Sequence, residues 1–210
     1  MTDSLFISNY TVIEEGITDK ILLDGMFKEF SKRKLMKMPD VGKIATLVAG
    51  GADSTLNFAM LLGINGFSYM VLLDNDHKGS ETKERLIKVC IPESAIFIPT
   101  IQENNGVNET DIEDLFSRDV YCDAFYSIYS DETKLSLEEC KIQFNDDKKK
   151  INKVAKELLK GQKVELDKKG ISLKILEIIS TSDKIDKYTE NNFKYMFNSV
   201  YKSVLELESQ

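Results

Sequence analysis

The sequence lacks an apolar run long enough to cross a membrane, because none approaches the ~18–20 residues that a transmembrane helix needs. The first residues carry neither a basic cluster nor a long apolar segment, so we expect no secretion signal. Cysteine is scarce: Cys90, Cys122 and Cys140 are widely spaced and odd in number, which favours reduced thiols over disulfides or a zinc site. These absences together predict a cytoplasmic protein without membrane association.

Positive charge is also in deficit. The 210 residues include 35 acidic and 28 basic side chains, a formal net charge of −7, which argues against non-specific DNA binding by the whole surface. Lysines nevertheless gather locally, at 28–37 and at 148–163. The second stretch belongs to a segment, 146–169, dominated by Lys, Asp and Glu. We interpret it either as a solvated helical insertion or as a basic arm against a phosphate backbone.

The first half of the chain alternates strand and helix patterns. Short β-rich or apolar runs predict four strands, at 11–15, 44–49, 68–73 and 95–99. Helical patterns follow the first three, starting near Thr18, Ser54 and Glu81. Strands separated by helices predict right-handed βαβ units, and therefore an α/β fold with a parallel sheet.

The second half reads as mostly helical and highly charged. Helices are predicted over 111–129, 136–144, 146–159 and 191–207. Aromatic residues in the first of these are expected in the helix core rather than on a base-stacking platform: Tyr121, Phe125, Tyr126 and Tyr129. We divide the chain into a catalytic core, residues 1–116, and a charged helical region, residues 117–210, that completes the core or is appended to it.

Acidic residues end two of the predicted strands. Glu15 ends the first and precedes Gly16, and Asp74 ends the third. The carboxyl ends of parallel strands form the ligand crevice of an open sheet, so Glu15 and Asp74 face one crevice if these strands are neighbours. Asp76, two residues after Asp74, and Asp19, one helical turn after Glu15, are close enough to join them.

Converging carboxylates repel one another unless a cation lies between them. Hard divalent ions take oxygen ligands, and two such ions about 3.5–4 Å apart can activate water and stabilise the leaving oxygen in phosphodiester cleavage. Nearby glycines would allow tight turns and close approach of phosphate: Gly16, Gly50, Gly51 and Gly79. The residues alone leave alternatives open, because acids at strand ends also cap helices and Asp-x-Asp also occurs in phosphotransferases and nucleotide-sugar enzymes.

Three short motifs carry a family pattern. Residues 12–19 read Val-Ile-Glu-Glu-Gly-Ile-Thr-Asp, residues 48–52 read Val-Ala-Gly-Gly-Ala, and residues 72–79 read Leu-Leu-Asp-Asn-Asp-His-Lys-Gly. In this order they resemble the glutamate motif, the glycine turn and the Asp-x-Asp motif of TOPRIM domains, most closely those of overcoming lysogenization defect (OLD) nucleases. The resemblance spans about residues 10–116. It implies a Rossmann-like TOPRIM parallel sheet flanked by helices.

The resemblance implies a metal-dependent endonuclease that nicks or cleaves DNA with two Mg²⁺ or Mn²⁺ ions and, by analogy, acts in antiviral defence. Its metal ligands map onto Glu15, Asp19, Asp74 and Asp76, of which Glu15, Asp74 and Asp76 are also assigned to catalysis. A further acidic segment, 111–116, offers Glu113 or Asp114 as a ligand, although a helix capping box explains it too.

The family also has a late lysine that stabilises transition-state charge. The candidates here are Lys184, Lys187 and Lys194, and the sequence does not choose among them. His77, the single histidine, is interpreted as an exposed neighbour of Asp76 rather than a general base.

One departure from the family concerns ATP. OLD nucleases usually carry an ATPase domain before the TOPRIM domain, and no Gly-x-x-x-x-Gly-Lys-Ser/Thr loop occurs here. We therefore expect an excised nuclease domain, a split system with a separate ATPase subunit, or a stand-alone TOPRIM protein. Two rival functions remain: other TOPRIM chemistry, primase-like or RNA-processing, and a non-catalytic DNA-binding or assembly module. The sequence is compatible with a homo-oligomer.

Overall fold

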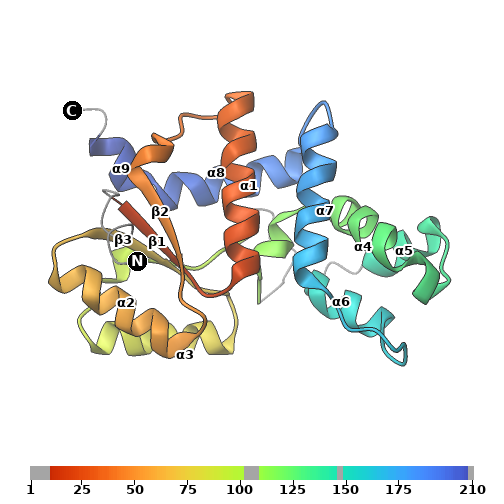
Figure 1. Cartoon of the computed structure of the whole chain (residues 1–210), viewed down its shortest axis with the longest axis horizontal. Helices are drawn as coiled ribbons and strands as arrows, with labels where there is room; N and C mark the ends of the chain where they lie inside the picture. The colour runs from red at the N-terminus through yellow and green to blue at the C-terminus, as the bar shows by residue number, and fades with distance from the viewer. Residues whose placement is uncertain (1–9, 102–108, 146–148, 208–210) are drawn as a thin grey trace.

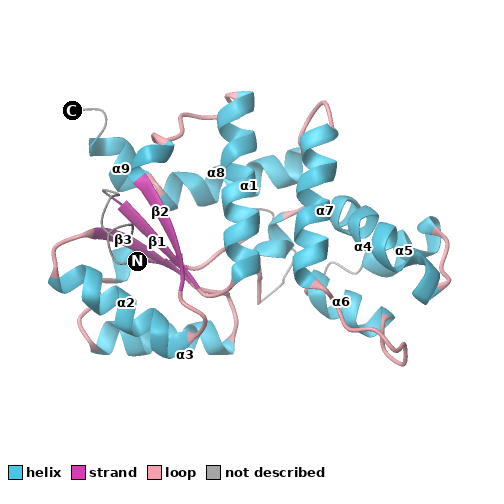
Figure 2. Ribbon diagram, in the orientation of Figure 1, coloured by secondary structure: helices cyan, strands magenta, loops and turns pink. Residues whose placement is uncertain are grey.

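The computed structural model describes residues 10–101, 109–145 and 149–207. At its centre lies a sheet of four parallel strands with helices on both faces (Figures 1 and 2). The strand order is β2-β1-β3-β4, with bounds β1 Tyr10–Glu14, β2 Ile44–Val48, β3 Ser68–Leu72 and β4 Ile96–Phe97. The predicted α/β fold is thus confirmed, with strand ends close to those expected.

The register of the central strands fixes the positions of the acidic motifs. β1 pairs in parallel with β3, and Glu14 lies opposite Leu72. Glu15 and Asp74 therefore leave the sheet at the same edge, the carboxyl end of both strands. The condition set by the sequence, that the first and third strands be neighbours, is met.

Side chains of β1 alternate between two apolar layers. Ile13 packs in a cluster with residues of α2 (Ala52–Ile64) and α3 (His77–Lys88). Tyr10 and Val12 belong to a larger cluster with α1 (Ile17–Arg33) and the C-terminal helices. A central strand buried on both faces is typical of a doubly covered parallel sheet.

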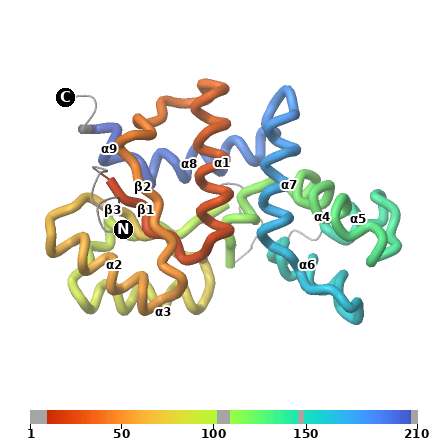
Figure 3. Tube along the Cα trace, in the orientation of Figure 1, coloured from red at the N-terminus to blue at the C-terminus, as the bar shows by residue number. Residues whose placement is uncertain are grey.

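Beyond β4 the chain is helical. A 3₁₀ turn, η3, spans Ile112–Leu115, and six helices follow it within the described ranges: α4 Arg118–Thr133, α5 Leu137–Phe144, α6 Ile151–Leu158, α7 Lys168–Thr181, α8 Lys187–Val200 and α9 Lys202–Leu207. Helices α4 to α7 form a lobe beside the sheet, and α8 and α9 return toward the strands (Figure 3). None of the helices in the described ranges is both long and apolar enough to span a bilayer.

One core cluster contains residues of the sheet, the lobe and α8, and α8 makes aromatic and hydrogen-bond contacts with the sheet side of the chain. Phe116 packs on Phe193 of α8 with ring centroids 4.9 Å apart, and Phe30 of α1 packs on Phe197 at 5.1 Å. The Tyr10 hydroxyl donates a hydrogen bond to the Val200 carbonyl at 2.5 Å. The division of the chain at residue 116 remains a prediction, and one buried cluster includes residues from both sides of it.

Helices α1 and α7 pack closely. A Cβ at Gly25 would stand 2.3 Å from Leu176 Cδ1, so the glycine permits the close approach. Arg33, the last residue of α1, donates hydrogen bonds to three carbonyls at the end of α7, those of Ile179, Ser182 and Asp183. The two helices are joined near the middle and at their C-terminal ends.

Helix boundaries in the second half differ from the prediction. The expected helix 111–129 is interrupted after Leu115, because Ser117 caps a new helix by accepting a hydrogen bond from the Val120 N–H. Helix α7 was not predicted, and the predicted helix 191–207 starts at Lys187 and is broken at Tyr201. In the predicted helix 146–159, α6 begins at Ile151, and residues 146–148 lie outside the described part.

The aromatic residues of α4 occupy the positions expected of them. Tyr121, Phe125 and Tyr129 are buried in the core, and Tyr126 is partly buried against it.

Candidate metal centre

Three carboxylates meet at the carboxyl edge of the sheet. Oxygens of Asp74, Asp76 and Asp111 lie within 4.8 Å of one another. Asp74 follows β3, Asp76 is the N-cap of α3, and Asp111 is the N-cap of η3. Carboxylate oxygens at this spacing are the donor set that Mg²⁺ and Mn²⁺ prefer. We call these three residues, with their neighbours Glu15, Asp19 and Glu113, the acidic cluster.

A short backbone pairing brings Asp111 to the site. The Asn75 N–H donates to the Thr110 carbonyl at 2.9 Å, and the Thr110 N–H donates back at 2.9 Å. This antiparallel bridge places the residue after Thr110 beside the residues flanking Asn75. Asp76 and Asp111 are thus neighbours through the main chain and do not need an ion to bring them together.

Gly79 holds the first turn of α3 against Asp74. Its N–H donates to Asp76 Oδ1 at 2.8 Å, and a Cβ at this position would stand 1.9 Å from the Asp74 carbonyl oxygen. Because the obstructing atom belongs to the backbone, no side-chain rotation would relieve the clash. Gly79 therefore serves close packing of helix on loop, whereas Gly50 and Gly51 have the positive φ angles, 78° and 136°, of a tight turn after β2.

Asp19 and Glu15 border the three central acids. Asp19, in the first turn of α1, accepts a hydrogen bond from the Gly16 N–H at 2.8 Å. Glu15 is partly buried, and its Oε1 lies 3.8 Å from Lys78 Nζ. The pKa of Asp19 is raised to about 7, first by burial and next by the charge of Glu113.

The pKa of Asp74 is strongly perturbed. Burial is the largest cause, and together with repulsion from the neighbouring carboxylates it raises the pKa of Asp74 to about 8; these carboxylates are those of Asp19, Asp111, Glu113 and Glu15. These interactions show that the carboxylates after β1 and β3, in α1 and at η3 share one electrostatic environment. A bound divalent cation would favour their ionised forms.

Glu113 and Asp114, the two further ligand candidates, have different surroundings. Glu113 is buried, and its Oε1 lies 3.2 Å from Lys168 Nζ without meeting hydrogen-bond geometry. Asp114 accepts backbone hydrogen bonds at both oxygens, from Asp111 at 2.9 Å and from Ile151 at 2.8 Å. Burial raises the pKa of Asp114 to about 6. Asp114 thus has a structural task, while Glu113 is available to the acidic cluster.

The lysines at the acidic cluster are not the catalytic candidates named from the sequence but belong to the lysine-rich segment 146–169. Lys150 Nζ lies 2.7 Å from Asp111 Oδ1 and 3.9 Å from Asp76 Oδ2. Lys168, in the first turn of α7, pairs with Glu113. Burial opposes the charged form of both lysines, yet the surrounding carboxylates raise the pKa of each. Both ammonium groups therefore stay charged beside the acids.

The predicted late lysines lie elsewhere. Lys184 and Lys187 are exposed, and Lys194 forms an ion pair with Glu190 one turn away on α8. Within the described residues, no contact joins any of the three to the acidic cluster. Their catalytic assignment stays a prediction without structural support. His77 is exposed beside Asp76, and its Nδ1 lies 3.7 Å from Glu81.

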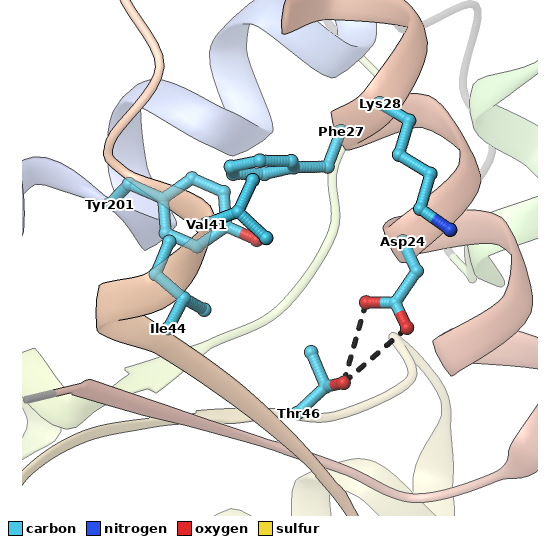
Figure 4. Close-up of a pocket in the computed structure, with 7 residues that line it drawn as sticks. All are labelled: Asp24, Phe27, Lys28, Val41, Ile44, Thr46 and Tyr201. Atoms are coloured by element: carbon cyan, nitrogen blue, oxygen red, sulfur yellow. Dashed lines mark hydrogen bonds between the residues drawn. The ribbon is translucent and has the colours of Figure 1, made fainter. Parts of the chain in front are cut away.

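A separate hollow of about 200 Å³ opens between α1 and β2 (Figure 4). Its walls are mainly apolar, formed by Phe27, Val41, Ile44 and Tyr201. Its carboxylate, Asp24, accepts a hydrogen bond from Thr46 Oγ1 at 3.3 Å and from Lys20 Nζ at 2.7 Å. Because this carboxylate is already paired, the hollow offers fewer free ligand atoms than the acidic cluster.

Comparisons with known proteins agree with this geometry. Residues 6–76 match the family model described as overcoming lysogenization defect protein-like, TOPRIM domain. The C-terminal region of the Xanthomonas campestris pv. campestris OLD protein superposes with a TM-score of 0.60 at 14% identity, covering 98% of this chain and 100% of that one. The C-terminal region of the Burkholderia pseudomallei OLD protein gives 0.54 at 13% identity, with 95% and 100% covered.

No curated protein matches the chain. At these identities the solved structures show the fold alone, and the family model identifies a TOPRIM segment over residues 6–76. TOPRIM domains bind divalent metals, and the acidic cluster supplies suitable ligands. Residues 6–76 therefore match an OLD-like TOPRIM domain, a fold of metal-binding nuclease type, and the fold of the chain is similar to that of OLD C-terminal regions.

Proposed function

We propose that this chain is a divalent-metal-dependent endonuclease that nicks or cleaves DNA. The observation that carries the proposal is that carboxylate oxygens of Asp74, Asp76 and Asp111 lie within 4.8 Å of one another. They lie at the carboxyl edge of the sheet, where Glu15 and Asp19 are also located. The OLD-like TOPRIM match supports the same reaction class.

We further propose that the acidic cluster holds two ions, although only its three central acids form a compact ligand set among the described residues. Asp74, Asp76 and Asp111 would hold one Mg²⁺ or Mn²⁺ ion, and Glu15, Asp19 and Glu113 would hold a second. Glu113 Oε1 is buried, has no hydrogen bond among the described residues and lies 3.2 Å from Lys168 Nζ, so a bound ion would share this oxygen with the lysine. When bound, such ions lower the pKa of water and stabilise negative charge on phosphate oxygens.

Lys168 is our candidate for the cation that stabilises charge in the transition state. It lies beside Glu113, and Asp111 and Asp74 also act on its pKa. A positive group preorganised at the reacting phosphate offers a large electrostatic effect. Lys150, held by Asp111, would orient that carboxylate and attract the phosphate backbone.

The test is cleavage of supercoiled plasmid by the purified chain with Mg²⁺, Mn²⁺ or EDTA. Asp74→Asn and Asp111→Asn should lose nicking, while Asp53→Asn, at an exposed position paired with Arg85, should keep it. Circular dichroism would verify that all variants fold. Nicking that survives Asp74→Asn at the wild-type rate would refute the assignment.

The same experiment separates the rival functions. Cleavage of RNA but not DNA would favour an RNA-processing TOPRIM enzyme, and nucleotide incorporation would favour primase-like chemistry. DNA binding without turnover under either metal would favour a binding or assembly module. By family analogy we also propose a separate ATPase subunit and a role in antiviral defence; turnover that appears only when an ATPase is added would support the split system.

A further inference from the structure

Helix α6 is attached directly to the acidic cluster. The Ile151 N–H, at its first residue, donates to Asp114 at 2.8 Å, and Asn152 Nδ2 donates to Asp111 at 3.3 Å. Lys150, the N-cap, contacts Asp111 and lies 3.9 Å from Asp76. The start of α6 is therefore fixed relative to the carboxylates that would hold metal.

The outward face of α6 is basic. Residues 149–163 contain six lysines and one glutamate, a net charge of +5 within a chain of net −7. Lys153, Lys156 and Lys160 are exposed and form no ion pair with any residue in the described ranges. Lys153 and Lys156, three residues apart, lie on one face of α6, and Lys160 follows in the turn after the C-cap Leu159. We call these three residues the lysine row.

The opposite face of α6 is not available to a partner. Ile151, Val154, Ala155 and Leu159 are buried in the main core cluster. A basic amphipathic helix binds a membrane by inserting its apolar face. Because this face is already packed, the lysine row can meet a polyanion only through its charge, which favours a phosphate backbone over a lipid bilayer.

The geometry of α6 suits a strand that leaves the acidic cluster. From Lys150 to Lys156 the helix rises about 9 Å, which is the axial length of almost three successive phosphates at roughly 3.4 Å each. Lys150 lies at the carboxylates, and the lysine row leads away from them. Phosphate contacts of this kind position a nucleic acid without reading its sequence.

We infer that the lysine row is the track that holds the nucleic-acid backbone next to the scissile phosphate. The inference rests on the proposed nuclease function and adds the surface by which the substrate is bound. Neutralising the row should weaken binding of DNA sequences uniformly, because the contacts are to phosphate. Once DNA is saturating, the chemical step should be unchanged, since none of the three lysines contacts the acidic cluster.

The experiment measures binding of a short fluorescein-labelled DNA duplex by anisotropy in Ca²⁺, across a salt series, with the full chain. The variant is Lys153→Gln/Lys156→Gln/Lys160→Gln. The matched control is Lys28→Gln/Lys32→Gln/Lys88→Gln, which removes the same charge from the C-terminal parts of α1 and α3, away from the cluster. A Lys153→Arg/Lys156→Arg/Lys160→Arg variant keeps the charge.

Loss of three phosphate contacts should make the slope of log K against log salt less steep by about 2.7 in the glutamine variant. Between 50 and 200 mM salt, the affinity of this variant for DNA should therefore decrease by a factor about 40 times smaller than the decrease for wild type. The arginine variant and the control should keep the wild-type slope. The inference about the lysine row would be overturned if the glutamine variant bound DNA with wild-type affinity and slope, or if the control variant lost as much affinity as the glutamine variant. Either outcome would leave the nuclease proposal standing. Failure of the wild-type chain to bind any DNA would overturn both.

Discussion

Replacing Glu14 with glutamine should stabilise the protein, and more strongly as pH rises. Glu14 ends β1, is fully buried, and has no hydrogen-bond partner for either carboxylate oxygen among the described groups. Burial, followed by repulsion from Asp24, raises its pKa to about 9, and Lys20 only partly opposes this. The folded protein therefore keeps Glu14 protonated at neutral pH.

The magnitude follows from proton linkage. In the unfolded chain Glu14 has a pKa near 4.5 and is ionised at pH 7, so folding must take up a proton. Because the folded pKa is raised, stability is greatest below pH 4.5 and is lost as pH increases toward 9. Each pH unit costs about 1.4 kcal/mol, which gives about 3 kcal/mol at pH 7. Glutamine is neutral in both states and removes this cost.

The assay is urea unfolding of wild type and Glu14→Gln in EDTA, from pH 5 to pH 8. The difference in unfolding free energy should grow by about 1.4 kcal/mol per pH unit, and Tm at pH 7 should rise by roughly 6–12 °C. Glu84→Gln, at an exposed position of α3, is the control and should show no such trend. A difference that does not depend on pH would refute the reasoning, because Glu14 would then be ionised or paired in the folded state.

Three further outcomes concern the acidic cluster. Asp114→Ala should reduce the free energy of unfolding by roughly 2–6 kcal/mol, measured in urea, because two buried N–H groups lose their acceptor; a neutral result would contradict its structural task. Mn²⁺ at about 100 times its Kd should stabilise wild type by about 2.7 kcal/mol in a thermal melt, and an equal gain in Asp74→Asn would place the ion elsewhere. Lys168→Met should reduce kcat by about 10²–10³-fold while keeping Mn²⁺ stabilisation, with Lys168→Arg as the conservative control; an unchanged kcat would remove Lys168 from the reaction.

The sequence was sufficient for those parts of the site that local patterns determine. Strand patterns gave the parallel sheet, and the ends of β1 and β3 gave Glu15 and Asp74 a common edge. Asp76 and Asp19 followed because each lies within one turn of these positions. Short-range spacing and strand direction are enough to predict such neighbours.

Residues from distant segments could not be placed in the same way. Asp111 reaches the site through the Asn75–Thr110 bridge, and Lys150 through the binding of the start of α6 to Asp114. Neither pairing leaves a periodic pattern in the sequence. Lys168 depended on α7, whose buried stripe, Ile171, Ile175 and Ile179, did carry a helical signal at four-residue spacing beside a segment dominated by charge.

The close packing of α1 on α7 at Gly25 is an apolar contact that influences the distances between charged groups in the acidic cluster. α1 carries Asp19 in its first turn and α7 carries Lys168 in its own, while Arg33 joins the far ends. The two helices therefore behave as one rigid unit. The distance between them at Gly25 and Leu176 sets the separation of the Asp19 carboxylate and the Lys168 ammonium group, about two helical turns away. A larger residue at position 25 would push α1 and α7 apart and so change the distances between charges in the acidic cluster, without replacing any charged residue.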